Sequence, residues 1–207
     1  MRKTTVGLLI SLVVIAASAV ATPAAGALVW KFDGTQLTGS ETVVGAATDS
    51  SLAIPGATTE CKDFLLNMKI TNDPAAKGEI TEAPFFECST SNPACTVESI
   101  EAEKLPWLAH AVAIVSGASS GGKYVVIEGI HIGIVYSGAL CSLAGSVEVK
   151  GSAGGLFNNT TSSLKFDKAT FAATGTELKV GSASVEWNAE FLMEAFGAHA
   201  GEKLELG

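Results

Sequence analysis

Strict alternation of apolar and polar residues is the feature that most constrains how this chain folds. From residue 185 to residue 194, one parity is entirely apolar, and the other consists of Glu, Asn and Leu. Residues 62–70 follow the same pattern, with Phe64, Leu66, Met68 and Ile70 on the apolar parity. Successive side chains of a β-strand point to opposite faces, whereas a helix would scatter these apolar residues around its circumference. Both stretches are therefore predicted to be half-buried strands.

Two central segments are apolar on both parities and rich in β-branched residues. They are residues 107–115 and 124–136, and a Ser/Gly-rich loop at 116–123 separates them. This composition predicts strands that are buried on both faces and joined as a long hairpin. Shorter strands are expected at residues 28–32, 79–81, 96–100, 146–150, 163–166, 169–173 and 177–180.

The breaks between these segments indicate the fold class. Gly, Asn and Asp recur there, and no stretch combines a helical period with caps. Many short strands at this spacing are typical of sandwiches and barrels. We therefore predict an all-β fold, an antiparallel two-sheet sandwich with a barrel-like alternative, stapled by disulfides. Residues 28–55 are too short to form a core of their own.

The N-terminus has the order of a secretory signal peptide. Arg2 and Lys3 precede an apolar core at residues 6–17, and Ala-x-Ala sites follow at residues 19–21 and 25–27. The apolar core is shorter than the ~20 residues that a spanning helix needs, which argues against a membrane anchor. We predict a signal peptide at residues 1–27 and one β-rich extracytoplasmic domain at residues 28–207, with no membrane span after signal cleavage.

The mature chain is expected to keep four cysteines, Cys61, Cys88, Cys95 and Cys141. An even number in an exported chain predicts disulfides, and four cysteines allow three pairings. The short, turn-rich segment between Cys88 and Cys95 favours Cys88–Cys95 together with Cys61–Cys141. The rival is Cys61–Cys88, which would join neighbouring strands. A zinc site is the other interpretation, but the spacings contain no Cys-x-x-Cys pair.

Charge excludes two classes of partner. Signal cleavage removes Arg2 and Lys3 from the 13 basic residues, which leaves 11 lysines against 21 acidic residues and a net charge of −10. Arg2 is the only arginine in the sequence. Nucleic acids and anionic lipids bind basic clusters, so neither is expected as a main partner.

Serine motifs of hydrolases occur here without the structure that they need. Residues 117–121 match Gly-x-Ser-x-Gly around Ser119, but a predicted strand follows where a nucleophile elbow requires a helix. Ser120 with Lys123, and Ser162 with Lys165, match Ser-x-x-Lys, an arrangement that works when one helical turn aims the lysine at the serine. The first pair lies in a predicted loop and the second leads into a predicted strand, so neither is expected to be catalytic.

The histidines do not show the spacing of a metal site. His110, His131 and His199 are far apart in the sequence. On strand parity, His131 shares a face with Gly129 and Gly133. That pattern predicts either a shallow groove for a ligand or, as is usual for glycines in strands, the close approach of an aromatic ring or a neighbouring strand. Packing is the favoured interpretation.

The densest acidic patch consists of Glu98, Glu101 and Glu103. Calcium binding and glycoside cleavage are two chemistries for clustered carboxylates, but the spacing fits neither, and a solvated surface is favoured.

The three tryptophans lie inside apolar runs and are predicted to be core rather than sugar-stacking platforms, namely Trp30, Trp107 and Trp187. Asn158 and Asn159 begin overlapping glycosylation sequons, which matter only in a eukaryotic source. No catalytic, cofactor-binding or metal-ligating residue is assigned, and no cofactor is expected.

Three runs carry a resemblance to known proteins: IPGATTECK at residues 54–62, IEAEKLPW at 100–107 and GSAGGL at 151–156. Over most of the mature chain, the sequence resembles exported proteins of soil actinobacteria that have no assigned activity. The resemblance implies a bacterial envelope or extracellular setting and brings no catalytic residues.

From the residues, we expect a secreted or envelope-associated, non-catalytic binding or structural protein. Its partner would be an envelope polymer or another extracellular protein. The alternatives are an extracellular hydrolase with a site assembled from distant residues, and a small outer-membrane β-barrel. Central strands that are apolar on both faces and only two tyrosines count against the barrel alternative.

Overall fold

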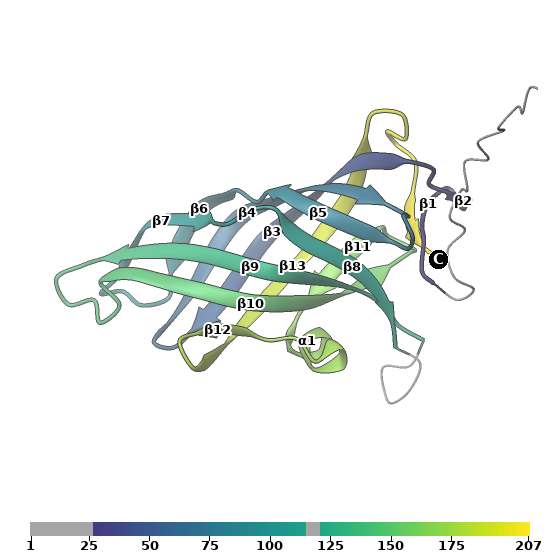
Figure 1. Cartoon of the computed structure of the whole chain (residues 1–207). Helices are drawn as coiled ribbons and strands as arrows, with labels where there is room; N and C mark the ends of the chain where they lie inside the picture. The colour runs from purple at the N-terminus through teal and green to yellow at the C-terminus, as the bar shows by residue number, and fades with distance from the viewer. Residues whose placement is uncertain (1–26, 115–120) are drawn as a thin grey trace, which may run out of the picture.

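The computed structural model of the chain describes residues 27–114 and 121–207. Almost the whole predicted signal peptide lies outside these residues, as do Ser119 and Ser120 of the serine motifs. The described residues form antiparallel strands and one short helix (Figure 1). The elements are β1 (Trp30–Phe32), β2 (Thr35–Gln36), β3 (Ser40–Ile54), β4 (Ala57–Thr71), β5 (Lys77–Glu82), β6 (Phe85–Thr90), β7 (Thr96–Ala102), β8 (Trp107–Ala113), β9 (Lys123–Ser137), β10 (Gly145–Asn158), β11 (Ser163–Phe166), α1 (Lys168–Thr174), β12 (Leu178–Val180), β13 (Ala183–Phe196) and β14 (Leu204–Leu206).

Strand pairing closes the main sheet into a barrel. The order β13-β3-β4-β5-β8-β9-β10 is continuous, and β11 and β12 each bridge β10 back to β13. Strands β6 and β7 extend the wall by pairing with β4 and β9. The prediction of an antiparallel all-β fold with two disulfides is confirmed, and the ring of pairings matches its barrel-like alternative.

Side chains fill the interior of the barrel. On β13 the apolar parity is buried, and the Glu and Asn parity is exposed, as its alternation predicts. Aromatic rings from different strands pack together in the core: the Phe166 and Trp187 rings stack with centroids 4.6 Å apart, and the Phe64 and Phe191 rings meet edge to face at 5.2 Å. Buried aromatic rings of this kind dominate the energetics of a core.

A small sheet, β14-β1-β2, closes one end of the barrel (Figure 1). Its Trp30 is fully buried and meets Phe157 of β10 edge to face at 5.6 Å. The buried amide of Asn72 holds β1 in place, because it accepts from the Trp30 N–H at 2.6 Å and donates to the Trp30 and Leu37 carbonyls. The prediction that the tryptophans are core is confirmed, since Trp107 and Trp187 are also buried.

Most predicted strands are present, including the central hairpin. Strand β8 pairs with β9, as expected of residues 107–115 and 124–136. Strand β9 is buried on both faces over most of its length, but β8 is not, because Leu108 is 53% exposed on its outer face.

One predicted strand is wrong: residues 169–173 belong to helix α1. The Asp167 side chain accepts a hydrogen bond from the Thr170 N–H, and the Thr170 hydroxyl closes the capping box on the Asp167 backbone. Gly175 ends the helix with a left-handed φ of 67°. A capping box and a C-terminal glycine start and stop even a helix as short as this one.

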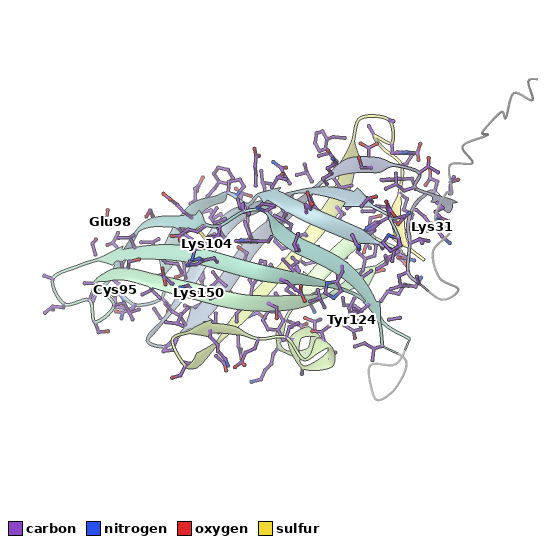
Figure 2. The ribbon with its side chains drawn as sticks, viewed as in Figure 1. Lys31, Cys95, Glu98, Lys104, Tyr124 and Lys150 are labelled. Carbon is purple, nitrogen blue, oxygen red and sulfur yellow. A yellow bond between two sulfur atoms is a disulfide. The ribbon has the colours of Figure 1, made fainter. Side chains whose placement is uncertain are left out.

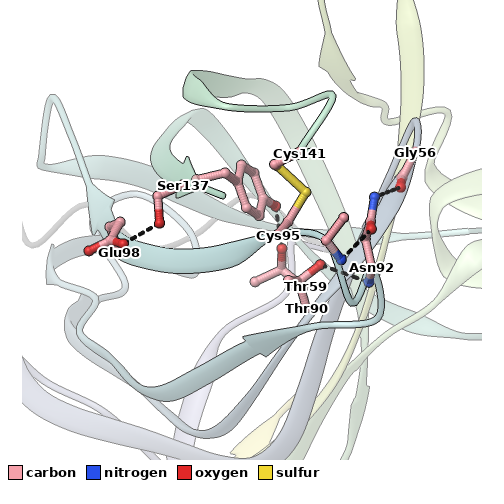
Figure 3. The surroundings of a disulfide bond; sticks show 10 residues. Gly56, Thr59, Thr90, Asn92, Cys95, Glu98, Ser137 and Cys141 are labelled. Carbon is pink, nitrogen blue, oxygen red and sulfur yellow. Dashed lines mark hydrogen bonds between the residues drawn. A yellow bond between two sulfur atoms is a disulfide. The ribbon is translucent and has the colours of Figure 1, made fainter. Parts of the chain in front are cut away.

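Both disulfides differ from the favoured pairing, which is wrong. The structure has Cys61–Cys88 and Cys95–Cys141, so the rival Cys61–Cys88 is confirmed. Cys61 of β4 and Cys88 of β6 lie directly opposite each other on paired strands. Strand β6 continues past Cys88 to Thr90, so Cys88 lies within a strand and not in the turn that was expected to bring it to Cys95. Cys141, in the turn between β9 and β10, closes over Cys95 (Figure 3).

Candidate functional site

His131 lies on the outer face of β9, yet it is only 3% exposed. Its neighbours Ile130 and Ile132 belong to the core, so the intervening imidazole points outward. The side chains of Glu103 and Glu148 cover it. Its Nε2 atom lies 3.5 Å from Glu103 Oε2 and 3.4 Å from Glu148 Oε1. We call these three residues the His131 cluster.

Strand pairing brings the cluster together from three places in the chain. Glu103 follows β7, and its backbone N–H donates to the His131 carbonyl at 2.7 Å. Glu148 lies on β10, directly opposite Gly133 of β9. Lys150, two residues along β10, is directly opposite His131. Figure 2 shows Lys104 and Lys150 on either side of β9 at this point.

Gly133 is the residue that admits Glu103 to the cluster. A Cβ atom at this position would lie 2.3 Å from Glu103 Oε1, which is too close for any real contact. Gly133 thus permits a close approach, but the group that approaches is the Glu103 carboxylate and not the predicted aromatic ring or neighbouring strand. Gly129 differs, because it has a φ of 72° and no neighbour near its Cβ position.

The His131 Nε2 atom has no hydrogen-bond partner. Within residues 27–114 and 121–207, it is the only buried side-chain nitrogen or oxygen without one. Its distances to the two carboxylates exceed those of ordinary N–H···O hydrogen bonds, about 2.7–3.2 Å. The hydrogen bond and positive charge of Lys150 lower the pKa of Glu148, which keeps that carboxylate ionised beside the imidazole. The arrangement is a buried nitrogen facing two carboxylate oxygens.

A second feature of the outer wall is a groove of ≈ 660 Å³ across β4, β5, β8 and β9. We call it the Leu108 groove. Exposed Leu108 lies in it beside His110, with residues of both charges around them: Lys69, Asp73, Lys77, Glu79 and Glu128. His110 is therefore a groove residue, and it is remote in sequence from any other histidine.

Among the residues that the structure describes, the other predicted site residues do not assemble into a site. His199 pairs with Glu202 at 2.9 Å and stacks on Phe32. The Ser162 hydroxyl donates to the Leu204 carbonyl, whereas Lys165 pairs with Asp167. This Ser-x-x-Lys pair is thus divided between different partners.

The glutamates of the predicted acidic patch also contact different partners. Glu98 accepts a hydrogen bond from the Ser137 hydroxyl near the Cys95–Cys141 disulfide (Figure 3), whereas Glu103 turns to His131. Of the sequon asparagines, Asn159 uses its amide on both backbone groups of Leu206, so it is occupied within the fold.

Sequence reasoning named His131 and Glu103 for separate reasons and missed Glu148. No local signal links residues 131 and 148, because their contact depends on the register of β9 with β10. The signal that was available is the glycine two residues after His131, which marks a position where another group lies against the strand.

No helix in the described part of the chain is both long and apolar enough to cross a membrane. Comparison of the chain with protein-family models, with curated proteins and with solved structures gives no match.

Proposed function

We propose that this chain is a secreted or envelope-associated protein that binds an envelope polymer on the outside of its barrel and catalyses no reaction. The observation that carries the proposal is the Leu108 groove. It offers exposed Leu108 between ammonium groups and carboxylates on a wall of paired strands. Such a surface suits a polymer that bears amino and carboxyl groups along with apolar side chains, which is the chemistry of a peptide-bearing envelope polymer.

The rest of the molecule supports binding on the outer surface. Packed aromatic rings occupy the interior, which favours binding of a ligand on the outside of the wall. Two disulfides indicate an oxidising compartment outside the cytoplasm. Rigid walls with prepared surfaces bind at a lower cost in conformational entropy than flexible ones.

The polarity of the wall bears on the outer-membrane alternative. Glu186, Glu190 and Glu194 of β13 are exposed on the outside, and apolar residues face inward. A lipid-facing wall has the opposite arrangement, an apolar exterior. This polarity favours a barrel surrounded by water.

The test is sedimentation of the purified, disulfide-bonded protein with isolated envelope of its source. We expect saturable pelleting that Leu108→Ala weakens about tenfold, as for loss of one good apolar contact. Leu192→Ala is the matched control. Leu192 lies on β13, outside the groove, and its exposed fraction of 50% is close to the 53% of Leu108. Equal pelleting of the two variants would contradict the proposal, and release of soluble polymer fragments by the protein would favour the hydrolase alternative.

A further inference from the structure

The starting point is the unpartnered Nε2 atom of His131. It is shielded from solvent and faces two carboxylate oxygens at 3.4 and 3.5 Å, farther than in ordinary N–H···O hydrogen bonds. A buried polar atom without a partner is costly, so such an atom calls for an explanation. An ion held between the three side chains would provide one.

We propose that Glu103, His131 and Glu148 bind a zinc ion on the outer face of β9. The proposal goes beyond the proposed polymer-binding function and does not depend on it. One nitrogen and two carboxylate oxygens, all within 4.8 Å of one another, form the ligand set.

The two separations from Nε2 fit tetrahedral coordination. Zinc bonds to histidine and carboxylate of about 2.0–2.1 Å separate the ligand atoms of a tetrahedron by roughly 3.3–3.4 Å. The observed separations from Nε2 are 3.4 and 3.5 Å. An octahedral magnesium site with bonds of about 2.0–2.1 Å would need ligand atoms only roughly 2.9 Å apart. Calcium takes oxygen ligands, and the imidazole counts against it.

Each carboxylate presents one oxygen to the site and uses the other elsewhere. Glu148 Oε1 faces His131, and its Oε2 accepts from Lys150. Glu103 Oε2 faces His131, and its Oε1 lies over Gly133. Outer contacts of this kind orient metal ligands, and their loss typically weakens metal binding 10- to 100-fold. Two carboxylates and a neutral imidazole also balance the charge of a divalent cation.

The site keeps a position open to solvent. Glu103 and Glu148 are about half exposed, whereas the imidazole forms the buried floor. Three protein ligands with a fourth position left to water is the arrangement of an accessible zinc site, not of a closed structural one. The competing explanation is a protonated His131 held between the carboxylates without any metal.

The test is zinc titration of the full mature protein with its disulfides intact, after removal of metal by a chelator. We expect one zinc ion per chain in competition with a chromogenic chelator. Cobalt in place of zinc should give the intense visible absorption of tetrahedral coordination. Zinc should also raise the temperature of unfolding, because it binds only the folded chain.

Variants separate the site from chance binding. Glu148→Gln, on a half-exposed side chain, and His131→Asn should each lower the zinc affinity at least tenfold and abolish the cobalt spectrum. Lys150→Ala should lower the affinity about tenfold, as for an outer contact. His199→Gln, in the other His–Glu pair at 2.9 Å, should leave affinity unchanged. Absence of stoichiometric binding, or binding that survives Glu148→Gln and is lost in His199→Gln, would overturn the proposal and leave His131 as an ion-paired histidine.

Discussion

Replacement by alanine should destabilise the fold strongly at one of two glycines on neighbouring strands and hardly at all at the other. Gly151 of β10 has a φ of 141°, in a region that side chains rarely adopt. A Cβ atom there would lie 2.1 Å from the Glu177 carbonyl oxygen and 3.2 Å from Leu178 Cα, and both are backbone atoms. Gly151→Ala therefore forces the β10–β12 pairing apart.

The magnitude follows from three contributions. The strained backbone costs about 1–3 kcal/mol. Loss of the hydrogen bond from the Ser152 N–H to the Glu177 carbonyl, now 3.0 Å, costs about 1 kcal/mol. Partial exposure of Leu178, which is fully buried, adds roughly 1 kcal/mol. The free energy of unfolding should fall by about 3–5 kcal/mol, which lowers the unfolding temperature by roughly 6–20 °C for a domain of this size.

Gly133→Ala is the matched control. The three atoms nearest to a Cβ at Gly133 all belong to the flexible Glu103 side chain, and the φ of Gly133 lies outside the left-handed region. Glu103 can swing away into solvent, and alanine reduces the entropy of the unfolded chain by about 0.4–1 kcal/mol. The free energy of unfolding should change by less than about 1 kcal/mol, while zinc affinity falls because Glu103 leaves His131.

The assay is urea unfolding under oxidising conditions, followed by the fluorescence of the three buried tryptophans. The reasoning is that a backbone neighbour cannot move away from a new Cβ atom, whereas a flexible side chain can. It would be refuted if Gly151→Ala lowered the free energy of unfolding by less than about 1 kcal/mol, or if both variants lowered it equally.

Two further predictions concern acid and the disulfides. Burial opposes ionisation of Asp167, but the Thr170 N–H and the Lys165 ammonium outweigh it, so the pKa of Asp167 lies below its usual value. Because the pKa of Asp167 is lower in the folded chain than in the unfolded chain, the ionised carboxylate stabilises the fold above about pH 4, and this stabilisation is lost as the pH falls further. In thermal unfolding, the stability advantage of the unaltered protein over Asp167→Asn should therefore shrink between roughly pH 5 and pH 2. Replacing Cys95 and Cys141 together by alanine should cost about 4 kcal/mol in urea unfolding, given their separation of 46 residues. Peptide mapping without reductant that recovers a Cys88–Cys95 link would contradict the structure.

The strands that the sequence predicts best are those whose two faces differ most. Strand β13 alternates Trp and Phe with Glu, so its period is unmistakable. Strand β3 was missed, although it lies in the middle of the barrel wall, because Gly45, Ala46 and Ala47 give little contrast between faces. A positive φ at Asp49 also interrupts its alternation. Small residues can occupy a central strand, since its pairing on both sides holds it in place.

The helix and the disulfides were mispredicted for different reasons. Helix α1 is one short stretch whose apolar residues fit a strand as well as a helix, and the Asp167 capping box was the decisive signal. The disulfides depend on which residues face each other across strands. Cys61 and Cys88 are opposite because of the register of β4 with β6, and chain distance carries no information on that register.

The His131 cluster, like the disulfides, depends on strand register, which the sequence does not reveal. An apolar side chain at position 131 would leave no polar atom unpaired on the outer face of β9. The wall instead places a histidine there, a glycine at position 133 that makes room for Glu103, and Lys150 beside Glu148 to hold one of its oxygens. Packing accounts for each of these features singly. A cation between Nε2 and the two carboxylates accounts for all of them together, because it supplies the partner that the buried nitrogen lacks and the charge that the two carboxylates require.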